Sequence, residues 1–316
     1  DDVLLNSGTV QSFGTGDFRI DAGTSTGAGV FTMAAGTLLN SSGGPLIIDA
    51  DGNVTIAEID HQSAGAPAAD VTIISTNGSV TLLASEGGIV ATNGASVSLN
   101  ADTGVTLNDV VTVDNAGSIT VDADVDNNAA GSLTTSAAGT LTVATGNILI
   151  VASDVSLAGA VAGSGTLTLQ PSTVAASVGV GGGTGSFNVS DAELLLLADG
   201  YSLVTIGDAA AGTGAVDIDQ STFVDAISIA GGTIVVEQLT ASDTVDNGDG
   251  TGLQNVTLTA RTGSITDGEN ASVTDVTGAL VTLNAEAGVI GEATGVGNEA
   301  LELAADTLVT DTTNGS

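Results

Sequence analysis

The sequence contains no lysine, cysteine or tryptophan, and Arg19 and Arg261 are its only arginines. The absence of cysteine excludes a disulfide scaffold. Against the two arginines stand 37 acidic residues, which gives a formal net charge of −35 over 316 residues. Because binding to phosphate groups depends on Lys and Arg, we expect neither nucleic acid nor an anionic membrane surface as a partner.

Aromatic residues and long apolar runs are also scarce. Aromatics make up 2% of the chain, and no apolar run approaches the roughly 20 residues of a membrane span, so no membrane insertion is expected. Hydrophobic residues nevertheless make up 42%, which is too many for an acidic disordered chain. A core of Val, Leu, Ile and Ala with few aromatics is typical of thin, regularly stacked layers.

A short pattern recurs along the chain: an aliphatic residue, then Thr or Ser, then another aliphatic residue. Its period of two predicts short β-strands with one aliphatic and one hydroxyl-bearing face. Turn residues such as Asn77-Gly78 separate the triplets. The triplets stand at 54–56, 71–73, 80–82, 97–99, 105–107, 111–113, 119–121, 141–143, 155–157, 167–169, 227–229, 256–258 and 281–283.

The spacing of these triplets favours a solenoid over a sandwich. A sandwich normally has longer strands and a buried Trp or Tyr. Three strands of this length, with their turns, occupy about 20 to 25 residues, which is one coil of a β-solenoid. We therefore predict an all-β chain of stacked, parallel three-stranded coils.

One segment interrupts the repeat. Ser190-Asp191-Ala192-Glu193 has the pattern of a capping box before four leucines, and Gly200 follows. It predicts a short helix over about 191–198. We expect a solenoid block over 1–175, a Gly-rich loop and helix over 176–204, and a second solenoid block over 205–316.

Two stretches resemble a known family. The run Asn255-Val-Thr-Leu-Thr-Ala-Arg-Thr-Gly-Ser-Ile-Thr-Asp-Gly is echoed from Val281, and Gly165-Thr-Leu-Thr-Leu-Gln-Pro-Ser is followed by Asp191-Ala-Glu-Leu. Both resemble repeats of the filamentous-haemagglutinin-like giant surface proteins of bacteria, over most of residues 70–316. The resemblance implies a right-handed parallel β-helix, secretion, and adhesive or surface-structural roles.

Three acidic clusters are candidate metal sites. Calcium takes six to eight oxygen ligands, which carboxylates and amides supply. None of the clusters has the spacing of an EF-hand or of the nonapeptide calcium repeat. Solvated turn residues therefore remain the alternative to Ca²⁺, the one cofactor that we consider. The clusters are Asp49, Asp51 and Asn53; Asp122, Asp124 and Asp126; and Asp243, Asp246 and Asp249.

Catalytic and sugar-binding residues are few. A lyase needs a cationic group, and Arg19, Arg261 and His61 are far apart in the sequence. We expect His61 on the surface. Sugar binding normally uses aromatic platforms, whereas the five Phe and one Tyr are scattered and most are expected in the core. The sequence therefore predicts no enzyme.

The first hypothesis is a secreted structural or adhesive protein of the bacterial cell surface. Residues 301–310 continue the repeat without a polar cap, and open strand edges normally need caps. The solenoid is thus expected either to belong to a giant adhesin or to stack head to tail into an extracellular filament. The alternative is a calcium-dependent module that binds a sugar or a protein, and a polysaccharide-degrading β-helix enzyme ranks below it.

Overall fold

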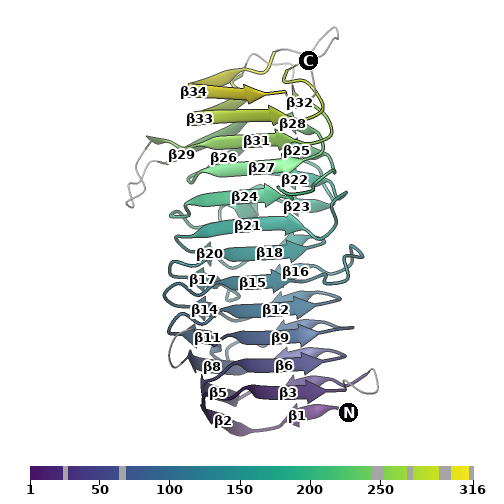
Figure 1. The fold of residues 1–316 in the computed structure, drawn as a ribbon, viewed down its shortest axis with the longest axis vertical. Helices are drawn as coiled ribbons and strands as arrows, with labels where there is room; N and C mark the ends of the chain where they lie inside the picture. Colours follow the sequence, from purple (N-terminus) through teal and green to yellow (C-terminus); the bar gives the residue numbers. More distant parts are fainter. Residues whose placement is uncertain (24–27, 64–68, 244–251, 269–272, 292–299, 313–316) are drawn as a thin grey trace. The chain divides into compact units, whose positions relative to one another are not determined.

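The computed structural model describes residues 1–23, 28–63, 69–243, 252–268, 273–291 and 300–312. The chain forms two compact units, Asp1–Gly165 and Thr166–Ser316. Each unit consists of parallel sheets of short strands, so the predicted all-β parallel solenoid is confirmed in both (Figure 1). None of the described helices has the length and hydropathy that a membrane span requires.

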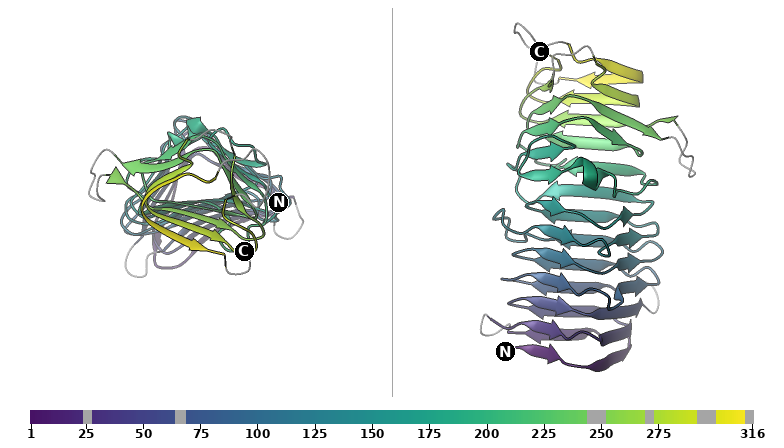
Figure 2. Two further views of the ribbon diagram at one scale, coloured as in Figure 1. Left: turned by 90° about the horizontal axis from the view of Figure 1, so that it is seen from above. Right: turned by 180° about the vertical axis from the view of Figure 1, so that it is seen from behind.

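The N-terminal unit coils through three parallel sheets, and each of its first six coils contributes one strand to each sheet. Figure 2 shows the coils from behind and from above. The first sheet contains β1 (Val3–Leu5), β4 (Phe31–Met33), β7 (Val54–Ile56), β10 (Val80–Leu82), β13 (Val105–Leu107), β16 (Leu133–Thr135) and β19 (Val155–Ser156). The second contains β2 (Gly8–Gly14), β5 (Thr37–Gly43), β8 (Glu58–Ser63), β11 (Gly88–Thr92), β14 (Val111–Val113), β17 (Leu141–Val143) and β20 (Val161–Ala162). The third contains β3 (Phe18–Ala22), β6 (Leu46–Ala50), β9 (Val71–Ser75), β12 (Val97–Ala101), β15 (Ile119–Asp122) and β18 (Ile148–Ala152).

The register aligns equivalent residues of successive coils in columns. Val54, Val80 and Val105 are consecutive partners in the first sheet, and all three are buried. The intervening Thr55, Thr81 and Thr106 form the neighbouring outward column. Burying each aliphatic side chain stabilises the fold by about 1.5–3 kcal/mol. The predicted aliphatic–hydroxyl triplets all lie in strands, except that β19 ends at Ser156 and leaves out Leu157.

Corners between strands use residues that tolerate tight or left-handed backbone. Asn93 and Gly94, in the turn between β11 and β12, have φ angles of 62° and 82°. Gly88 has a φ of 76°, and a Cβ atom there would lie 2.1 Å from the backbone oxygen of Val110 in the next coil. A side chain at residue 88 would therefore separate two coils.

The C-terminal unit is built on two parallel sheets. The larger contains β21 (Thr166–Pro171), β24 (Leu203–Gly207), β27 (Ile227–Gly231), β31 (Val256–Ala260), β33 (Val276–Ala285) and β34 (Leu303–Asp311). The start of β33 also pairs with a branch formed by β26 (Ser221–Phe223) and β29 (Leu239–Asp243), and β30 (Gly252–Leu253) pairs antiparallel with β29. The smaller sheet contains β23 (Phe187–Val189), β22 (Val178–Val180), β25 (Val216–Ile218), β28 (Ile234–Val236) and β32 (Ile265–Asp267).

The predicted helix exists but is short. α1 spans Asp191–Leu194, and the carboxylate of Glu193 accepts hydrogen bonds from the backbone N–H (2.8 Å) and the hydroxyl (2.7 Å) of Ser190. Leu195 and Leu196 form a turn after the helix, and Leu197 lines a pocket. Strands β22 and β23 lie within the segment predicted as a Gly-rich loop.

Candidate functional site

The first predicted metal cluster lies at the end of β6, and its residues have different partners. Asp49 accepts a hydrogen bond of 2.6 Å from Arg19 Nη2. Asp51 accepts one of 2.7 Å from the side-chain amide of Asn77. The side-chain oxygen of Asn53 accepts one of 3.0 Å from the backbone N–H of Ser79. These side chains therefore connect neighbouring coils.

The second predicted cluster gathers carboxylates from two coils. Asp124 is fully buried, and its Oδ2 accepts a 2.9 Å hydrogen bond from the backbone N–H of Ala129. Partial burial and the negative charges of Asp126 and Asp124 raise the pKa of Asp102. Burial and the charge of Asp124 also raise the pKa of Asp122, although the backbone N–H of Asp124 opposes the effect. The shifts indicate that like charges are close together here.

Asp102 is not part of the cluster that the sequence pattern predicts. The strand register shows that Asp102 lies near the cluster, because Asn100 of β12 pairs with Asp122 of β15. Two residues further along, Asp102 and Asp124 therefore occupy corresponding positions in successive coils. Only the pairing of β12 with β15 brings them together, since 22 positions separate them in the sequence.

The third predicted cluster can be assessed only at one residue. Asp243 is buried at the end of β29, whereas Asp246 and Asp249 lie outside the described residues. Within the described ranges, no three His, Asp or Glu side chains are arranged so that they could hold a metal ion. Calcium binding stays a prediction at all three clusters.

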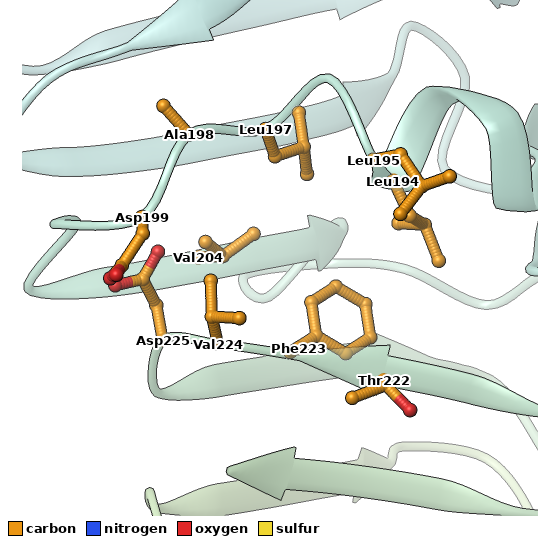
Figure 3. A pocket seen from close by; sticks show the side chains of 10 residues that line it. All are labelled: Leu194, Leu195, Leu197, Ala198, Asp199, Val204, Thr222, Phe223, Val224 and Asp225. Atoms are coloured by element: carbon orange, nitrogen blue, oxygen red, sulfur yellow. The ribbon is translucent and has the colours of Figure 1, made fainter. Parts of the chain in front are cut away.

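A pocket of about 330 Å³ opens in the C-terminal unit beside α1 (Figure 3). This volume is at the lower limit for small-molecule sites. Its walls are mainly aliphatic, and the rim residue Leu195 has 87% of its surface exposed. The lining residues are Leu194, Leu195, Leu197, Ala198, Asp199, Val204, Thr222, Phe223, Val224 and Asp225.

Asp199 and Asp225 lie at the same end of this pocket (Figure 3). Asp225 is buried, and its Oδ1 accepts a 3.0 Å hydrogen bond from the backbone N–H of Gly200. Burial, together with the charge of Asp225, raises the pKa of the nearby Tyr201 hydroxyl. The pocket walls offer two carboxylates but no cation, thiol or imidazole. The pocket is therefore better suited to binding an apolar group than to catalysing a reaction.

The expectation that His61 lies on the surface is wrong. His61 is fully buried in the N-terminal unit, where Nδ1 lies 2.7 Å from Ser41 Oγ and Nε2 lies 2.7 Å from the carbonyl oxygen of Ala69. β8 turns this residue inward, and the register places Ser41 of β5 directly beside it. Both ring nitrogens are occupied, and neither His61 nor Ser41 can reach a substrate in solvent.

Most aromatic side chains lie in the core, as predicted. Phe31, Phe187, Phe223 and Tyr201 are buried, and Phe18 is half-buried. Phe13, on β2, is the exception with 71% of its surface exposed. A single exposed ring does not form the aromatic platform that a sugar-binding groove would use.

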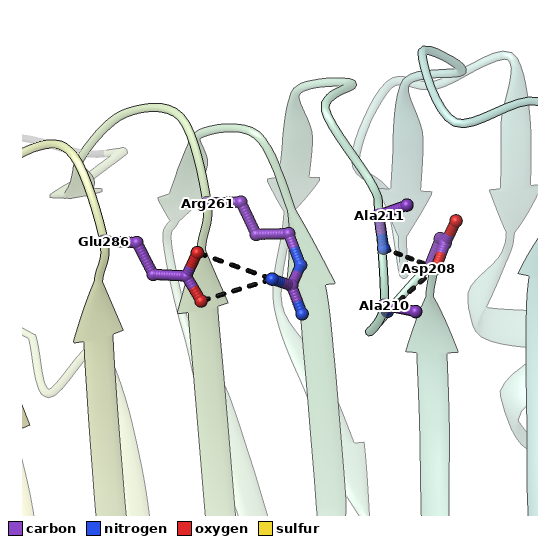
Figure 4. Close-up of polar contacts among 5 residues, drawn as sticks. All are labelled: Asp208, Ala210, Ala211, Arg261 and Glu286. Atoms are coloured by element: carbon purple, nitrogen blue, oxygen red, sulfur yellow. Dashed lines mark hydrogen bonds and ion pairs between the residues drawn. The ribbon is translucent and has the colours of Figure 1, made fainter.

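The two arginines connect neighbouring coils. Arg19 binds Asp21 of its own strand and Asp49 of the next coil, each at 2.6 Å. Arg261 follows β31, and its Nη1 lies 3.2 Å from Glu286 Oε1 after β33 (Figure 4). Asp208, also drawn there, accepts hydrogen bonds of 2.9 Å from the N–H groups of Ala210 and Ala211. These charged groups hold turns and coils in place.

A pair of carboxyl groups lies where β34 joins the C-terminal unit. The backbone N–H of Asp275 donates to the carbonyl oxygen of Glu302 (2.9 Å), and the N–H of Glu302 donates to Asp275 Oδ2 (2.6 Å). Burial raises the pKa of Asp275 to about 7; the charges of Asp267 and Glu302 add to this effect, and the Glu302 N–H opposes it. Asp275 therefore keeps its proton at pH values where an exposed aspartate has already lost it.

Comparisons of the chain with protein-family models, curated proteins and solved structures found no match.

Proposed function

We propose that this chain is a non-enzymatic structural or adhesive protein of the bacterial cell surface. It acts as a β-solenoid segment, either within a giant adhesin or in an extracellular filament built by head-to-tail stacking. The resemblance to filamentous-haemagglutinin-like repeats supports the surface location, and the acidic composition suits a soluble extracellular chain.

The observation that carries the proposal is the use of polar side chains to join coils. Arg19–Asp49, Asn77–Asp51 and Arg261–Glu286 each connect neighbouring coils. Aliphatic columns fill the space between the sheets. This distribution supports a scaffold whose repeated coils provide length and rigidity.

A catalytic role has less support. Glycoside hydrolysis needs an acid and a second carboxylate at a suitable separation in an accessible cleft. In the pocket beside α1, Asp225 is buried and hydrogen-bonded to Gly200. The His61–Ser41 pair is inaccessible to solvent. We therefore assign no catalytic residues.

The proposal can be tested on cells and on the purified chain. Immunogold labelling of the source bacterium should place the protein outside the outermost membrane, and negative-stain electron microscopy should show fibres or separate solenoid segments. Label confined to the cell interior would contradict the surface role. Release of oligosaccharides from a polysaccharide panel by the purified chain would contradict the non-enzymatic assignment.

A calcium-dependent binding module is the second candidate. Within the described residues no three carboxylates are placed to hold a metal ion, so Ca²⁺ would have to draw the side chains of Asp102, Asp122, Asp124 and Asp126 together. A divalent cation would relieve the repulsion that raises the pKa of Asp102 and Asp122. Isothermal titration with Ca²⁺ should give binding that Asp126→Asn weakens, while Asp306→Asn, at an exposed position of β34, serves as the control. Equal binding by the two variants and the unmodified chain would exclude this cluster.

A further inference from the structure

The pocket beside α1 forms where two segments of the C-terminal unit leave the regular coil. One segment is the turn after α1, which contributes Leu197 and Asp199 to the walls. The other is the end of β26 and the residues that follow it, which contribute Phe223 and Asp225. Val204 of β24 is buried between them (Figure 3). A space of about 330 Å³ stays open between these segments.

The two ends of this pocket differ in chemistry. Leu194 and Leu195 lie at one end, and Asp199 and Asp225 lie at the other (Figure 3). Leu195 is the most exposed of the large apolar residues, and it continues the apolar wall to the outer surface. Exposed apolar surface that leads into a pocket with a few convergent polar groups is typical of a ligand-binding site.

The charge of the acidic end determines which ligand head group it favours. Two carboxylates that lie close together repel each other, and a cation between them offsets this repulsion. Among the described residues, those that line the pocket include no cation. Arg261 lies elsewhere in the unit and binds Glu286. An ammonium group has three N–H donors, so it can form hydrogen bonds to both carboxylates at once.

A buried hydroxyl group lies near the same end. Tyr201 is 1% exposed, and among the described residues its hydroxyl has no hydrogen-bond partner. Burial and, in addition, the charge of Asp225 raise the pKa of this hydroxyl, so the two side chains are close together. Tyr201 is the only tyrosine of the chain, which has no tryptophan. Its fluorescence therefore reports on the acidic end of the pocket.

We propose that this pocket binds a small aliphatic primary amine. The ammonium group lies between Asp199 and Asp225, and the alkyl chain runs along Leu197 and Phe223 toward Leu195. The volume of the pocket is at the lower limit for small-molecule sites, which suits one short alkyl chain. This binding activity is separate from the proposed structural role, so the failure of one leaves the other intact.

A series of n-alkylammonium chlorides tests both ends of the pocket. Butyl-, pentyl- and hexylammonium should each cause a saturable change in Tyr201 fluorescence, and isothermal titration should give one site per chain. The affinity should rise about fourfold with each added methylene group, because each one is buried against the apolar walls. 1-Hexanol has the same chain without the charge and should bind about tenfold more weakly than hexylammonium.

Three variants locate the ligand in the pocket. Asp199→Asn changes a half-buried side chain and should lower the affinity for hexylammonium about tenfold, with no effect on 1-hexanol. Asp306→Asn removes the same charge at an exposed position of β34 and should bind hexylammonium like the unmodified chain. Leu195→Ala shortens the apolar wall at an exposed residue, so it should weaken the binding of both ligands by the same factor.

Several outcomes would overturn the amine site. Hexylammonium that causes neither saturable heat nor a change in Tyr201 fluorescence would exclude binding in the pocket. Equal losses of affinity in Asp199→Asn and Asp306→Asn would show that the acidic surface as a whole attracts the cation. Equal binding of 1-hexanol and hexylammonium would exclude the two carboxylates as partners of the head group.

Discussion

The two units differ in the polar groups that they bury. Among the described residues, the N-terminal unit buries hydroxyl groups, His61 and one acidic residue, Asp124. Among its described residues, the C-terminal unit buries the hydroxyl groups of Ser221 and Tyr201 and a larger set of carboxyl groups. These belong to Glu193, Asp208, Asp225, Asp243, Asp267 and Asp275.

The difference follows from the regularity of the coils. In the N-terminal unit each coil repeats three strands, so backbone groups of one coil pair with those of the next. In the C-terminal unit, α1 and the β26–β29 branch interrupt this repetition. Glu193, Asp208 and Asp225 then accept hydrogen bonds from backbone N–H groups in turns. Buried carboxylates therefore take the place of regular interstrand hydrogen bonds at positions where the repeating coil is interrupted.

Matched core substitutions should have the largest effect on stability. Leu99→Ala in the N-terminal unit and Leu258→Ala in the C-terminal unit each remove a completely buried side chain, at a cost of about 2–5 kcal/mol. Hydrogen exchange should show the loss of protection in coils next to the substituted residue, because each coil contacts only its neighbours. Uniform loss throughout the chain from either substitution would contradict this expectation.

The stability of the C-terminal unit should depend on pH through the carboxyl group of Asp275. Its pKa rises from 3.8 to about 7 in the folded chain, so the folded state keeps a proton that the unfolded state releases. This contribution to the free energy of unfolding is fully present below about pH 4 and is lost as the pH rises to about 7. Asp275→Asn should remove this pH dependence.

Denaturant unfolding at several pH values would measure the effect of Asp275→Asn, with Asp306→Asn at an exposed position as the control. An unchanged slope between pH 4 and pH 7 in Asp275→Asn would show that another group titrates. Local exchange near β34 should change in the same pH range, because Asp275 contacts Glu302 just before that strand.

Substitution of His61 tests how much its hydrogen bond to Ser41 stabilises the N-terminal unit. His61→Leu leaves the buried hydroxyl of Ser41 without its 2.7 Å partner, which should cost about 1–3 kcal/mol. The double variant His61→Leu with Ser41→Ala should recover part of this loss, since the Ser41 hydroxyl is then no longer left unpaired. Thermal unfolding of both variants gives the comparison, and equal destabilisation would exclude the hydrogen bond as the cause.

The arginine pairs should have the smallest effect on the stability of an isolated molecule. Arg19→Gln and Arg261→Gln remove partly exposed ion pairs, each worth about 0–1 kcal/mol. Chemical denaturation should detect little difference between them. A loss of more than about 1 kcal/mol in either variant would contradict this expectation.

Much of the fold could be predicted because its periodicity is local. A triplet such as Val80-Thr81-Leu82 specifies a strand and its buried face without information from other coils. The burial of His61 could not be predicted this way, because the short strand Glu58–Ser63 has two possible faces. The length of α1 was also overestimated, since helix propensity in the leucine run yields to packing around the pocket.

By itself, the amino-acid sequence determined the strand pattern, the aliphatic core and the strong negative charge, since each depends on residue type and local order. Tertiary structure alone decided which distant groups meet: Asp102 with Asp124, His61 with Ser41, and Asp275 with Glu302. These contacts depend on strand register and on the number of residues in each turn. A shift of one residue in register would move every side chain of a strand to its opposite face.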